Sequence, residues 1–361
     1  MTADALKAEI ARCYGTPAVV IDLDIVERNI ARAQSLCDRA GLANRPHIKT
    51  HKSPTIAALQ RDAGARGLSC QKLGEAEVMA AAGLDDLLIC YNLLGEQKIG
   101  RLGRLLGSAK VTVSADNPTV VAGLAPAAAQ AGRSLPVVVE CDTGRQRAGV
   151  TTAAEAVTLA RLIAATSGLT FAGLLLYPSD NGMAAAQAFL DTVKAGLAAE
   201  GLPPPAIVST GGTPNLAHLG EIHGASEHRA GTYVFNDRMM MAAGAATLAD
   251  CALTVLTTVV SRAAPDRGIL DAGSKALTSD KGNCDGYGVV VEYPDVRVPA
   301  LAEEHGFLDL GASAARPTVG ELVRVVPNHV CVVVNMTDRA VAVRGGKIVG
   351  DLPIAARGKT G

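Results

Sequence analysis

The chain has 361 residues, and its 34 basic and 35 acidic side chains give a formal net charge of −1, so nothing favours binding to nucleic acid or to an anionic membrane. Its apolar runs have the length of strands, its first residues lack the apolar core of a signal peptide, and its eight cysteines show no CxxC spacing. We therefore expect a cytoplasmic globular protein without a membrane or nucleic-acid partner.

From residue 18 to about residue 212, short β-branched runs alternate with helix-forming stretches. Eight strand-then-helix units predict an α/β fold, a parallel (β/α)8 barrel of the TIM type. A doubly wound open sheet is the alternative, but no G-x-G-x-x-G follows the first run. The predicted strands are 18–23, 45–50, 67–73, 86–91, 110–116, 136–142, 171–177 and 206–212.

After about residue 240 the helical stretches shrink, and strand-like runs alternate with turns. This pattern predicts a mostly antiparallel β domain. We expect a barrel domain over residues 14–240 and a β domain over residues 241–361, with residues 1–13 packed on the β domain.

Active sites of such barrels lie at the carboxyl ends of the strands. Four predicted strands end at or near Lys49, Gln71, Asp142 and Tyr177. Lys49 lies in RPHIKTHKSP (45–54), which holds five basic side chains. Like charge and desolvation favour the neutral amine of such a lysine, and Schiff-base formation with an aldehyde cofactor requires a neutral amine. A solvated turn is the alternative interpretation of this basic run.

Two glycine-rich stretches, STGGTP (209–214) and HRAGTYVFND (228–237), offer backbone N–H groups and hydroxyls that can bind a phosphate. Each is weak evidence by itself, because such sequences also occur in ordinary turns. Together with a lysine at a strand end, they predict a site for pyridoxal 5'-phosphate (PLP), with the phosphate anchored by the loops and the aldehyde held by the lysine.

With these motifs in this order, the sequence resembles the D-threonine aldolase / D-serine dehydratase family, which are fold-type III PLP enzymes related to alanine racemase. The resemblance covers nearly the whole chain and implies an alanine racemase-like barrel, a following β domain and a homodimer. It rests on TPAVVIDLD (16–24), RPHIKTHK (45–52), QKLGEAEV (71–78), DTGRQRAGV (142–150), STGGTP, HRAGTYVFND, ILDAGSKALTSD (269–280) and PNHVC (327–331).

The resemblance implies roles for individual residues. Lys49 is the Schiff-base lysine, and Arg147 matches an arginine near the phenolic oxygen of the cofactor. Arg229 stands where alanine racemase places an arginine against the pyridine nitrogen, and Tyr177 matches a tyrosine at the end of the seventh strand. The other residues expected to bind the cofactor are Gln71, Thr210, Gly211, Gly212, Gly231, Thr232 and Tyr233.

The PNHVC motif separates His329 and Cys331 by one residue. In a strand the two side chains would share a face and could hold zinc with coordination positions left open. A lone His-x-Cys pair in a β domain is usually core packing. The resemblance reverses that interpretation, because family members bind a divalent metal at a His-x-Cys or His-x-Asp pair. The thiolate favours zinc, with manganese or magnesium as alternatives.

One departure from the family follows the seventh strand. Many members carry a histidine soon after the tyrosine, proposed as the base for the β-hydroxyl, whereas this chain reads YPSDNGM (177–183). The base could instead be His51 or a metal-bound hydroxide, or the metal itself could acidify the hydroxyl. Together with Lys49 and Tyr177, His51 therefore completes the predicted catalytic set.

The expected function is a PLP- and divalent-metal-dependent lyase that cleaves small β-hydroxy-D-amino acids to glycine and an aldehyde. A dehydratase of D-serine or 3-hydroxy-D-aspartate, releasing a 2-oxo acid and ammonium, is the first alternative, and His-x-Cys favours it. An amino-acid racemase with Tyr287 or Tyr293 as second base is the next. A non-catalytic PLP carrier would need neither the β domain nor PNHVC.

Overall fold

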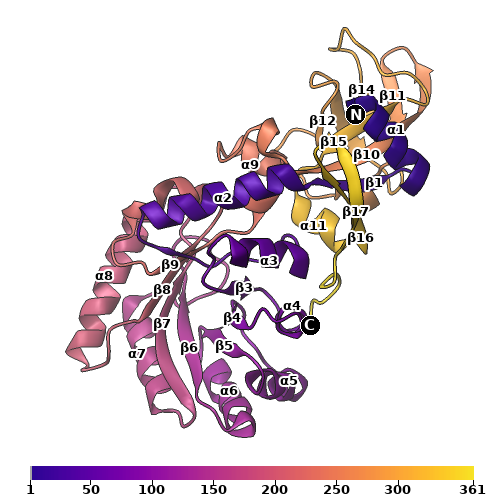
Figure 1. Cartoon of the computed structure of the whole chain (residues 1–361). Coiled ribbons are helices and arrows are strands. Elements are labelled where there is room, and N and C mark those ends of the chain that lie inside the picture. Colours follow the sequence, from indigo (N-terminus) through magenta and orange to yellow (C-terminus); the bar gives the residue numbers. More distant parts are fainter. Residues whose placement is uncertain (1) are drawn as a thin grey trace. The chain divides into compact units, whose positions relative to one another are not determined.

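The computed structural model describes residues 2–361, which divide into two compact units. The barrel unit comprises residues 32–49, 56–231 and 359–361. The β unit comprises the chain up to Ala31 together with residues 50–55 and 232–358. Figure 1 shows the elements of both units. One of the crossings between units is the peptide bond from Lys49 to Thr50.

The barrel unit is built on eight parallel strands in the order β2-β9-β8-β7-β6-β5-β4-β3. Beyond β2, His47 forms a parallel bridge with Ser69, so the two ends of this order also pair with each other. The predicted parallel α/β barrel is confirmed. Its strands are β2 (Ala43–Asn44), β3 (Leu68–Cys70), β4 (Asp86–Ile89), β5 (Lys110–Ala115), β6 (Leu135–Cys141), β7 (Leu169–Leu176), β8 (Ile207–Gly211) and β9 (Glu227–Arg229).

Helices cover the outer side of these strands, as Figure 1 shows for α5, α6, α7 and α8. Their starts follow from local sequence: Asn117 accepts the Val120 N–H at the start of α6, and Thr152 and Glu155 form a capping box at the start of α7. The helices that follow β1 to β8 are α2 (Leu23–Arg39), α3 (Pro54–Asp62), α4 (Leu73–Ala81), α5 (Glu96–Leu106), α6 (Pro118–Ala131), α7 (Ala153–Ala165), α8 (Met183–Ala199) and the 3-10 helix η1 (Pro214–Glu221).

The β unit is built on a mostly antiparallel sheet, as predicted. Its strand order is β13-β14-β11-β10-β1-β16-β17, and β15 pairs with both β10 and β12. The strands are β1 (Ala18–Asp22), β10 (Leu253–Ala264), β11 (Arg267–Leu270), β12 (Val289–Val290), β13 (Arg297–Leu301), β14 (Gly306–Asp309), β15 (Leu322–Val326), β16 (Arg339–Arg344) and β17 (Lys347–Pro353). Its helices are α1 (Ala3–Tyr14), α9 (Arg238–Ala242), α10 (Ser274–Leu277) and α11 (Val330–Asn335), with the 3-10 helices η2 (Thr232–Val234) and η3 (Leu248–Asp250).

The prediction that residues 18–23 form the first strand of the barrel is wrong. Strand β1 belongs to the sheet of the β unit, where it pairs antiparallel with β10 and parallel with β16. Its buried side chains Ala18 and Val20 pack against Ile10, Leu256 and Val341. An apolar run predicts a buried strand but not the sheet that receives it, because two β-rich units offer the same kind of apolar surface.

The eighth barrel strand is instead β9, whose residues Glu227, His228 and Arg229 are all polar and all buried. No apolar pattern marks it, so the sequence predicted only a phosphate loop there. The predicted strand 45–50 is also irregular: β2 ends at Asn44, His47 forms an isolated bridge, and a turn follows.

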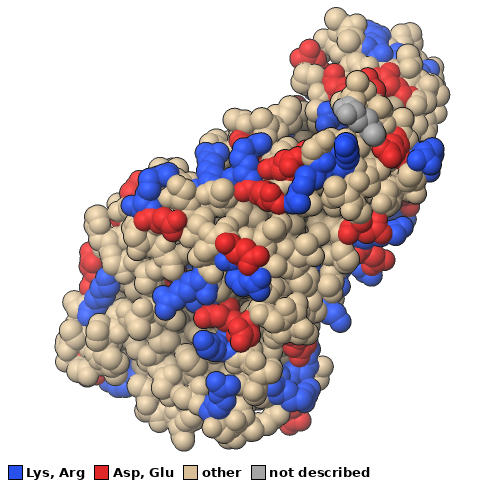
Figure 2. All heavy atoms as spheres, in the orientation of Figure 1, with Lys and Arg blue, Asp and Glu red and all other residues tan. Residues whose placement is uncertain are grey.

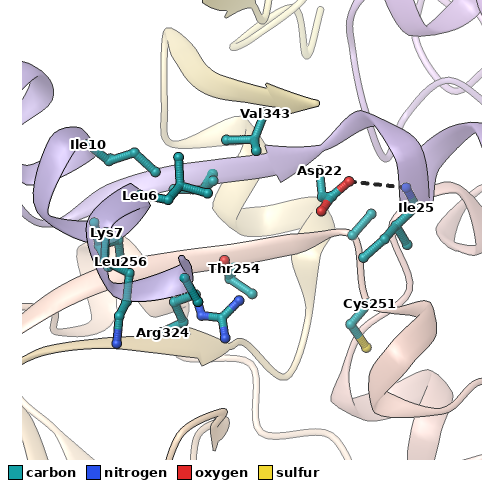
Figure 3. A pocket seen from close by; sticks show the side chains of 13 residues that line it. Leu6, Lys7, Ile10, Asp22, Ile25, Cys251, Thr254, Leu256, Arg324 and Val343 are labelled. Atoms are coloured by element: carbon teal, nitrogen blue, oxygen red, sulfur yellow. Dashed lines mark hydrogen bonds between the residues drawn. The ribbon is translucent and has the colours of Figure 1, made fainter. Parts of the chain in front are cut away.

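Helix α1 packs on the sheet of the β unit above a cavity of about 90 Å³ (Figure 3). The cavity is lined mainly by apolar side chains such as Leu6, Ile10 and Val343. The polar groups at its edge are paired, because Lys7 Nζ donates to the Leu322 carbonyl at 2.9 Å and Asp22 accepts the Ile25 N–H at 3.2 Å. The bond to Leu322 and the ion pair with Glu292 at 3.3 Å explain how Lys7 of α1 can be buried.

Charged side chains of both signs are interspersed on the face shown in Figure 2. Within residues 2–361, no helix combines the length and apolar composition needed to cross a bilayer.

Strands β7 and β8 approach each other closely at Gly173. The pairing of β6 with β7 shifts register there, and Gly173 has φ +148°. A Cβ at this position would lie 1.8 Å from the Ile207 carbonyl oxygen. Only glycine fits both the backbone conformation and the distance.

Gly173→Ala is therefore expected to lower the free energy of unfolding by more than about 2 kcal/mol, or to prevent folding. Gly100→Ala in α5 is the matched control, because the nearest atom to its Cβ is the end of the Arg104 side chain at 3.9 Å. The free energy of unfolding of that control is expected to rise by about 0.5–1 kcal/mol, because alanine is favoured over glycine inside a helix. Urea unfolding of the holoenzyme measures both, and equal stability of the two variants would contradict the close approach.

Candidate active site

Lys49 lies at the carboxyl end of the barrel strands. Backbone hydrogen bonds of 2.9 Å join His47 N–H to the Ala230 carbonyl and Ile48 N–H to the Ser69 carbonyl. The turn that begins at Ile48 then carries Lys49, whose side chain is half-buried. A short extended segment held by β3 and β9 thus sets the position of this lysine.

Arg229, at the end of β9, presents a hydrogen-bond donor with no acceptor. Its Nη2 donates to the Leu176 carbonyl at 3.1 Å, while the buried Nη1 has no hydrogen-bond partner among the described residues. A Cβ on Gly211 would lie 3.3 Å from Nη2 and 2.9 Å from the Arg229 carbonyl oxygen. Buried guanidinium donors are rarely left unsatisfied, so this unused N–H fits an acceptor supplied by a bound molecule, such as a pyridine nitrogen.

Tyr177 follows β7 and lies against the glycine loop after β8. A Cβ on Gly212, which has φ +111°, would lie 3.0 Å from Tyr177 Cε2. Two guanidinium carbons lie near its ring, that of Arg145 at 4.5 Å and that of Arg147 at 5.3 Å from the centroid. Arg145 is committed elsewhere, because it pairs with Asp180 at 2.5 Å. Arg147 makes only a 3.9 Å approach to Glu140, so its donors fit the predicted contact with the cofactor.

Glu140, near the end of β6, is a member of the site that the sequence analysis missed. It is buried beside Ser114, whose hydroxyl donates to it at 3.4 Å. Burial raises the pKa of this carboxyl, while Arg147 and Arg229 lower it. The available signal was a carboxylate inside the apolar run VVVEC, since buried acids in such runs are uncommon unless paired.

His228 connects β9 to the glycine loop after β8 and was also missed. The Gly212 carbonyl lies 3.0 Å from Nε2, so Nε2 carries the proton and donates. Nδ1 then accepts from the Thr210 hydroxyl at 2.9 Å. Burial lowers the pKa of His228 to about 4, against a hydrogen bond to Gly212 that raises it, so the imidazole is neutral at pH 7.

The remaining predicted cofactor residues are more dispersed. Gln71, after β3, donates through Nε2 to the Cys90 carbonyl at 2.8 Å, and its N–H donates to Glu75 at 2.7 Å. Gly231 is the last residue of that part of the barrel unit, whereas Thr232 and Tyr233 begin η2 in the β unit.

His329 and Cys331 do not lie on a strand, so that part of the prediction is wrong. Strand β15 ends at Val326, His329 precedes α11, and Cys331 lies in the first turn of that helix. The helix begins here because Asp237 accepts the Val330 N–H at 3.1 Å.

The two side chains nevertheless meet. A hydrogen bond to Cys331, opposed by burial and supported by the charge of Cys331 and by Asp280, raises the pKa of His329 to about 9. Asp280 Oδ2 lies 2.7 Å from His329 Nδ1, and the Thr50 hydroxyl lies 3.2 Å from the Cys331 sulfur. Imidazole and thiolate in contact form a donor pair that suits zinc.

No group of three or more His, Cys, Asp or Glu side chains within residues 2–361 is arranged to hold a metal ion. Among the described side chains, His329 and Cys331 would therefore be the only such ligands of a cation, and its other positions would be open to water or substrate. The predicted base His51 is fully buried, and its Nδ1 accepts the Ser53 N–H at 3.2 Å. That bond places the proton of a neutral His51 on Nε2, which makes Nε2 a donor.

Comparisons with known proteins agree with this architecture. Residues 21–239 match the alanine racemase N-terminal domain family, and residues 252–343 match a serine dehydratase domain family. The chain is 34% identical to a D-threonine aldolase of an Arthrobacter species, over 95% of this chain and 93% of that protein.

Two solved structures are also similar. The D-threonine aldolase of Filomicrobium marinum has a TM-score of 0.89 at 33% identity, covering 96% of each chain. The D-threo-3-hydroxyaspartate dehydratase of Delftia sp. HT23 has a TM-score of 0.81 at 31% identity, covering 94% of this chain and 97% of that one. Solved variants of such a dehydratase replace a histidine, or a cysteine two positions later, and the cysteine variant is described as metal-free.

The neutral, buried His228 predicts a pH dependence of stability. As pH falls through 6.5 the unfolded chain protonates this histidine, but the folded chain does not until about pH 4. In this window the unfolded state binds more protons than the folded state. The free energy of unfolding therefore falls by on the order of 3 kcal/mol between pH 6.5 and pH 4. His228→Gln, whose amide can replace both hydrogen bonds, is expected to flatten this part of the curve.

Urea unfolding between pH 7 and pH 4 measures the effect. His223→Gln is the matched control, because His223 is exposed and the same substitution there should keep the wild-type slope. A His228→Gln slope equal to that of the control would show that His228 does not titrate as its burial requires.

Proposed function

The chain belongs to the family of D-threonine aldolases and D-serine dehydratases, and we propose that it is a PLP- and divalent-metal-dependent lyase that cleaves β-hydroxy-D-amino acids to glycine and an aldehyde. One observation carries the proposal: each unit brings together side chains of the types that one requirement of that chemistry needs. The barrel unit has a lysine at a strand end and an unsatisfied arginine donor, and the β unit has a histidine and a cysteine in contact.

The barrel residues would hold the cofactor as follows. Lys49 would hold the aldehyde carbon, Arg147 the phenolic oxygen and Arg229 the ring nitrogen. Gly211 and Gly212 leave space that a side chain would fill. Because Arg229 donates an N–H, it would favour an unprotonated ring nitrogen that accepts this hydrogen bond. In the β unit, His329 and Cys331 would hold the cation, with zinc favoured by the thiolate.

When bound, PLP supplies an electron sink for the carbanion left at the α carbon, and the cation supplies Lewis acidity toward the β-hydroxyl. Retro-aldol cleavage must remove the proton of that hydroxyl. The hydrogen bond from Ser53 occupies the proton-accepting nitrogen of His51, so His51 is poorly prepared for this task. We therefore assign activation of the hydroxyl to the cation that His329 and Cys331 would hold, with a hydroxide bound to that cation taking the proton, rather than to His51.

A dehydratase remains the second candidate. The higher TM-score to the aldolase structure, 0.89 against 0.81, supports the aldolase. The His-x-Cys spacing supports the dehydratase, because solved variants of such an enzyme replace a histidine and a cysteine at the same spacing. The racemase is disfavoured at one of its two predicted bases, because the Tyr293 hydroxyl donates to Glu321, and this bond and burial raise the pKa of Tyr293 to about 12.

We also propose a homodimer in the cytoplasm. Tyr91 and Leu94 follow β4 at the carboxyl edge of the barrel, and they are 40% and 48% exposed. A tyrosine and a leucine exposed together on the edge that carries the active site suit a surface covered by a second copy of the chain.

Product identity tests the reaction. Holoenzyme incubated with D-threonine and zinc is expected to give glycine and acetaldehyde in equal amounts, and a chelator is expected to abolish both. Ammonium and 2-oxobutanoate without glycine would establish the dehydratase instead. Activity that is insensitive to the chelator would remove the role of His329 and Cys331.

The predicted roles of the two lysines are separated by absorption spectroscopy. Lys49→Ala is expected to lose the visible absorption band of the PLP-loaded protein, because no other amine is expected to hold the aldehyde. Lys52→Ala makes the same change three residues later and is expected to keep the band. The proposal fails if the Lys49 variant retains the band and the Lys52 variant loses it.

A further inference from the structure

The loop after α10 contacts the imidazole of His329. Asp280 Oδ2 lies 2.7 Å from His329 Nδ1, so the carboxylate accepts the Nδ1 proton. In the neutral imidazole this fixes the tautomer and leaves the lone pair on Nε2. A carboxylate behind a histidine in this way is the usual arrangement around a metal-binding imidazole, because it also fixes the rotation of the ring.

The backbone before Asp280 is held in an unfavourable conformation. Thr278 is β-branched and almost fully buried, yet it has φ +70°. Its N–H donates to the Ser274 carbonyl at 3.0 Å, and its hydroxyl accepts the Asp280 N–H at 3.1 Å. A β-branched residue in this region is costly, and such strain persists only where surrounding contacts enforce it.

Asn328 supplies those contacts from the other side. This buried residue directly precedes His329, and its Nδ2 donates to the carbonyls of Lys281 at 3.2 Å and Gly286 at 2.8 Å. Its Oδ1 accepts the Gly288 N–H at 2.8 Å. The loop that carries Asp280 is therefore tied to the residue next to the imidazole, so carboxylate and ring keep a constant relation.

The backbone between the two metal ligands is fixed as well. Asp237 accepts the N–H of Val330, the residue between His329 and Cys331, at 3.1 Å. The ring, the intervening peptide and the loop behind the ring are thus all anchored by side chains that the metal itself would not touch. An ordinary exposed ion pair would need none of these anchors.

We propose that Asp280 is a positioning residue that orients His329 so that Nε2, together with the Cys331 sulfur, faces a divalent cation. The inference rests on the proposed function only in taking His329 and Cys331 as the ligands. Asp280 is not assigned as a third ligand, because its Oδ2 contacts Nδ1 on the ring and the described residues contain no three-ligand group.

Zinc affinity of the PLP-loaded protein, measured by competition with a chromophoric chelator, tests the proposal without any turnover. Asp280→Ala is expected to weaken zinc binding about 10–100-fold. Asp280→Asn should lose less, because its carbonyl oxygen can still accept from Nδ1. The absorption of bound cobalt should keep its thiolate band in both variants, since Cys331 is untouched.

Asp285→Ala is the matched control. Asp285 lies in the same loop, its side chain is 83% exposed, and its nearest cation is Arg297 at 3.9 Å. It should bind zinc like the wild type. Wild-type affinity in both Asp280 variants would overturn the proposal, and if Asp280→Ala does not fold, the Asp280→Asn result decides alone.

The outcomes separate this inference from the proposed function. If wild-type protein yields no glycine from D-threonine but Asp280→Ala still weakens zinc binding, the reaction is wrong and the positioning role holds. If wild-type protein binds no divalent cation at all, both the metal pair and the role of Asp280 are overturned.

Discussion

The position of Lys49 depends on three backbone hydrogen bonds around Pro46. Besides the bonds from His47 to Ala230 and from Ile48 to Ser69, the Ser69 N–H donates to the Pro46 carbonyl at 2.9 Å. Proline cannot donate to a ladder, so a regular central strand is excluded here and the segment pairs only through its other groups. The result is a short connection that joins β9 to β3, closes the order of strands and turns sharply at Ile48. The role proposed for Lys49 depends on that turn, because the turn places its side chain at the carboxyl end of the strands.

The basic residues of the segment 45–54 have different functions, and that of Arg45 differs from the one proposed for Lys49. Arg45 is a structural residue: its Nε donates to the buried Glu227 at 2.8 Å and its Nη1 to Asp86 at 2.6 Å. A buried charge is tolerated only when it is paired and its hydrogen bonds are made, and here Ser209 also donates to Glu227 at 2.6 Å. Gly67 makes room for this network, since its Cβ would lie 2.5 Å from Arg45 Nη1. Removal of one partner would leave an unpaired charge inside the barrel.

The fold could be predicted from the sequence because a chain of alternating apolar strands and helices is compatible with few architectures. The family could be predicted from the order of the motifs. What could not be predicted depends on tertiary contacts. Strand β1 has the apolar sequence of a barrel strand but pairs with β10 in the other sheet. Strand β9 has no apolar residue, because its side chains face a polar network. His228 looked unremarkable in the sequence, since only the fold brings Thr210 and the Gly212 carbonyl to its two nitrogens. The local structure of PNHVC was missed because Asp237, far away in the chain, caps α11.

The polar groups of the barrel end differ in whether their hydrogen-bonding capacity is already used, and this difference bears on where a phosphorylated cofactor would bind. A phosphate needs donors. The Thr210 hydroxyl gives its proton to His228, and the Gly212 N–H donates to the Arg229 carbonyl at 2.8 Å, so neither has a proton left for a phosphate. Nη1 of Arg229 keeps a proton, but the proposed function assigns that donor to the ring nitrogen of the cofactor and not to its phosphate. The bond between Thr210 and His228 therefore braces the loop, while Arg229 keeps a donor for what the loop surrounds; the cofactor contact of Thr210 stays a prediction. A residue type that matches a phosphate loop is thus not by itself a phosphate ligand, because the neighbours decide which protons remain available.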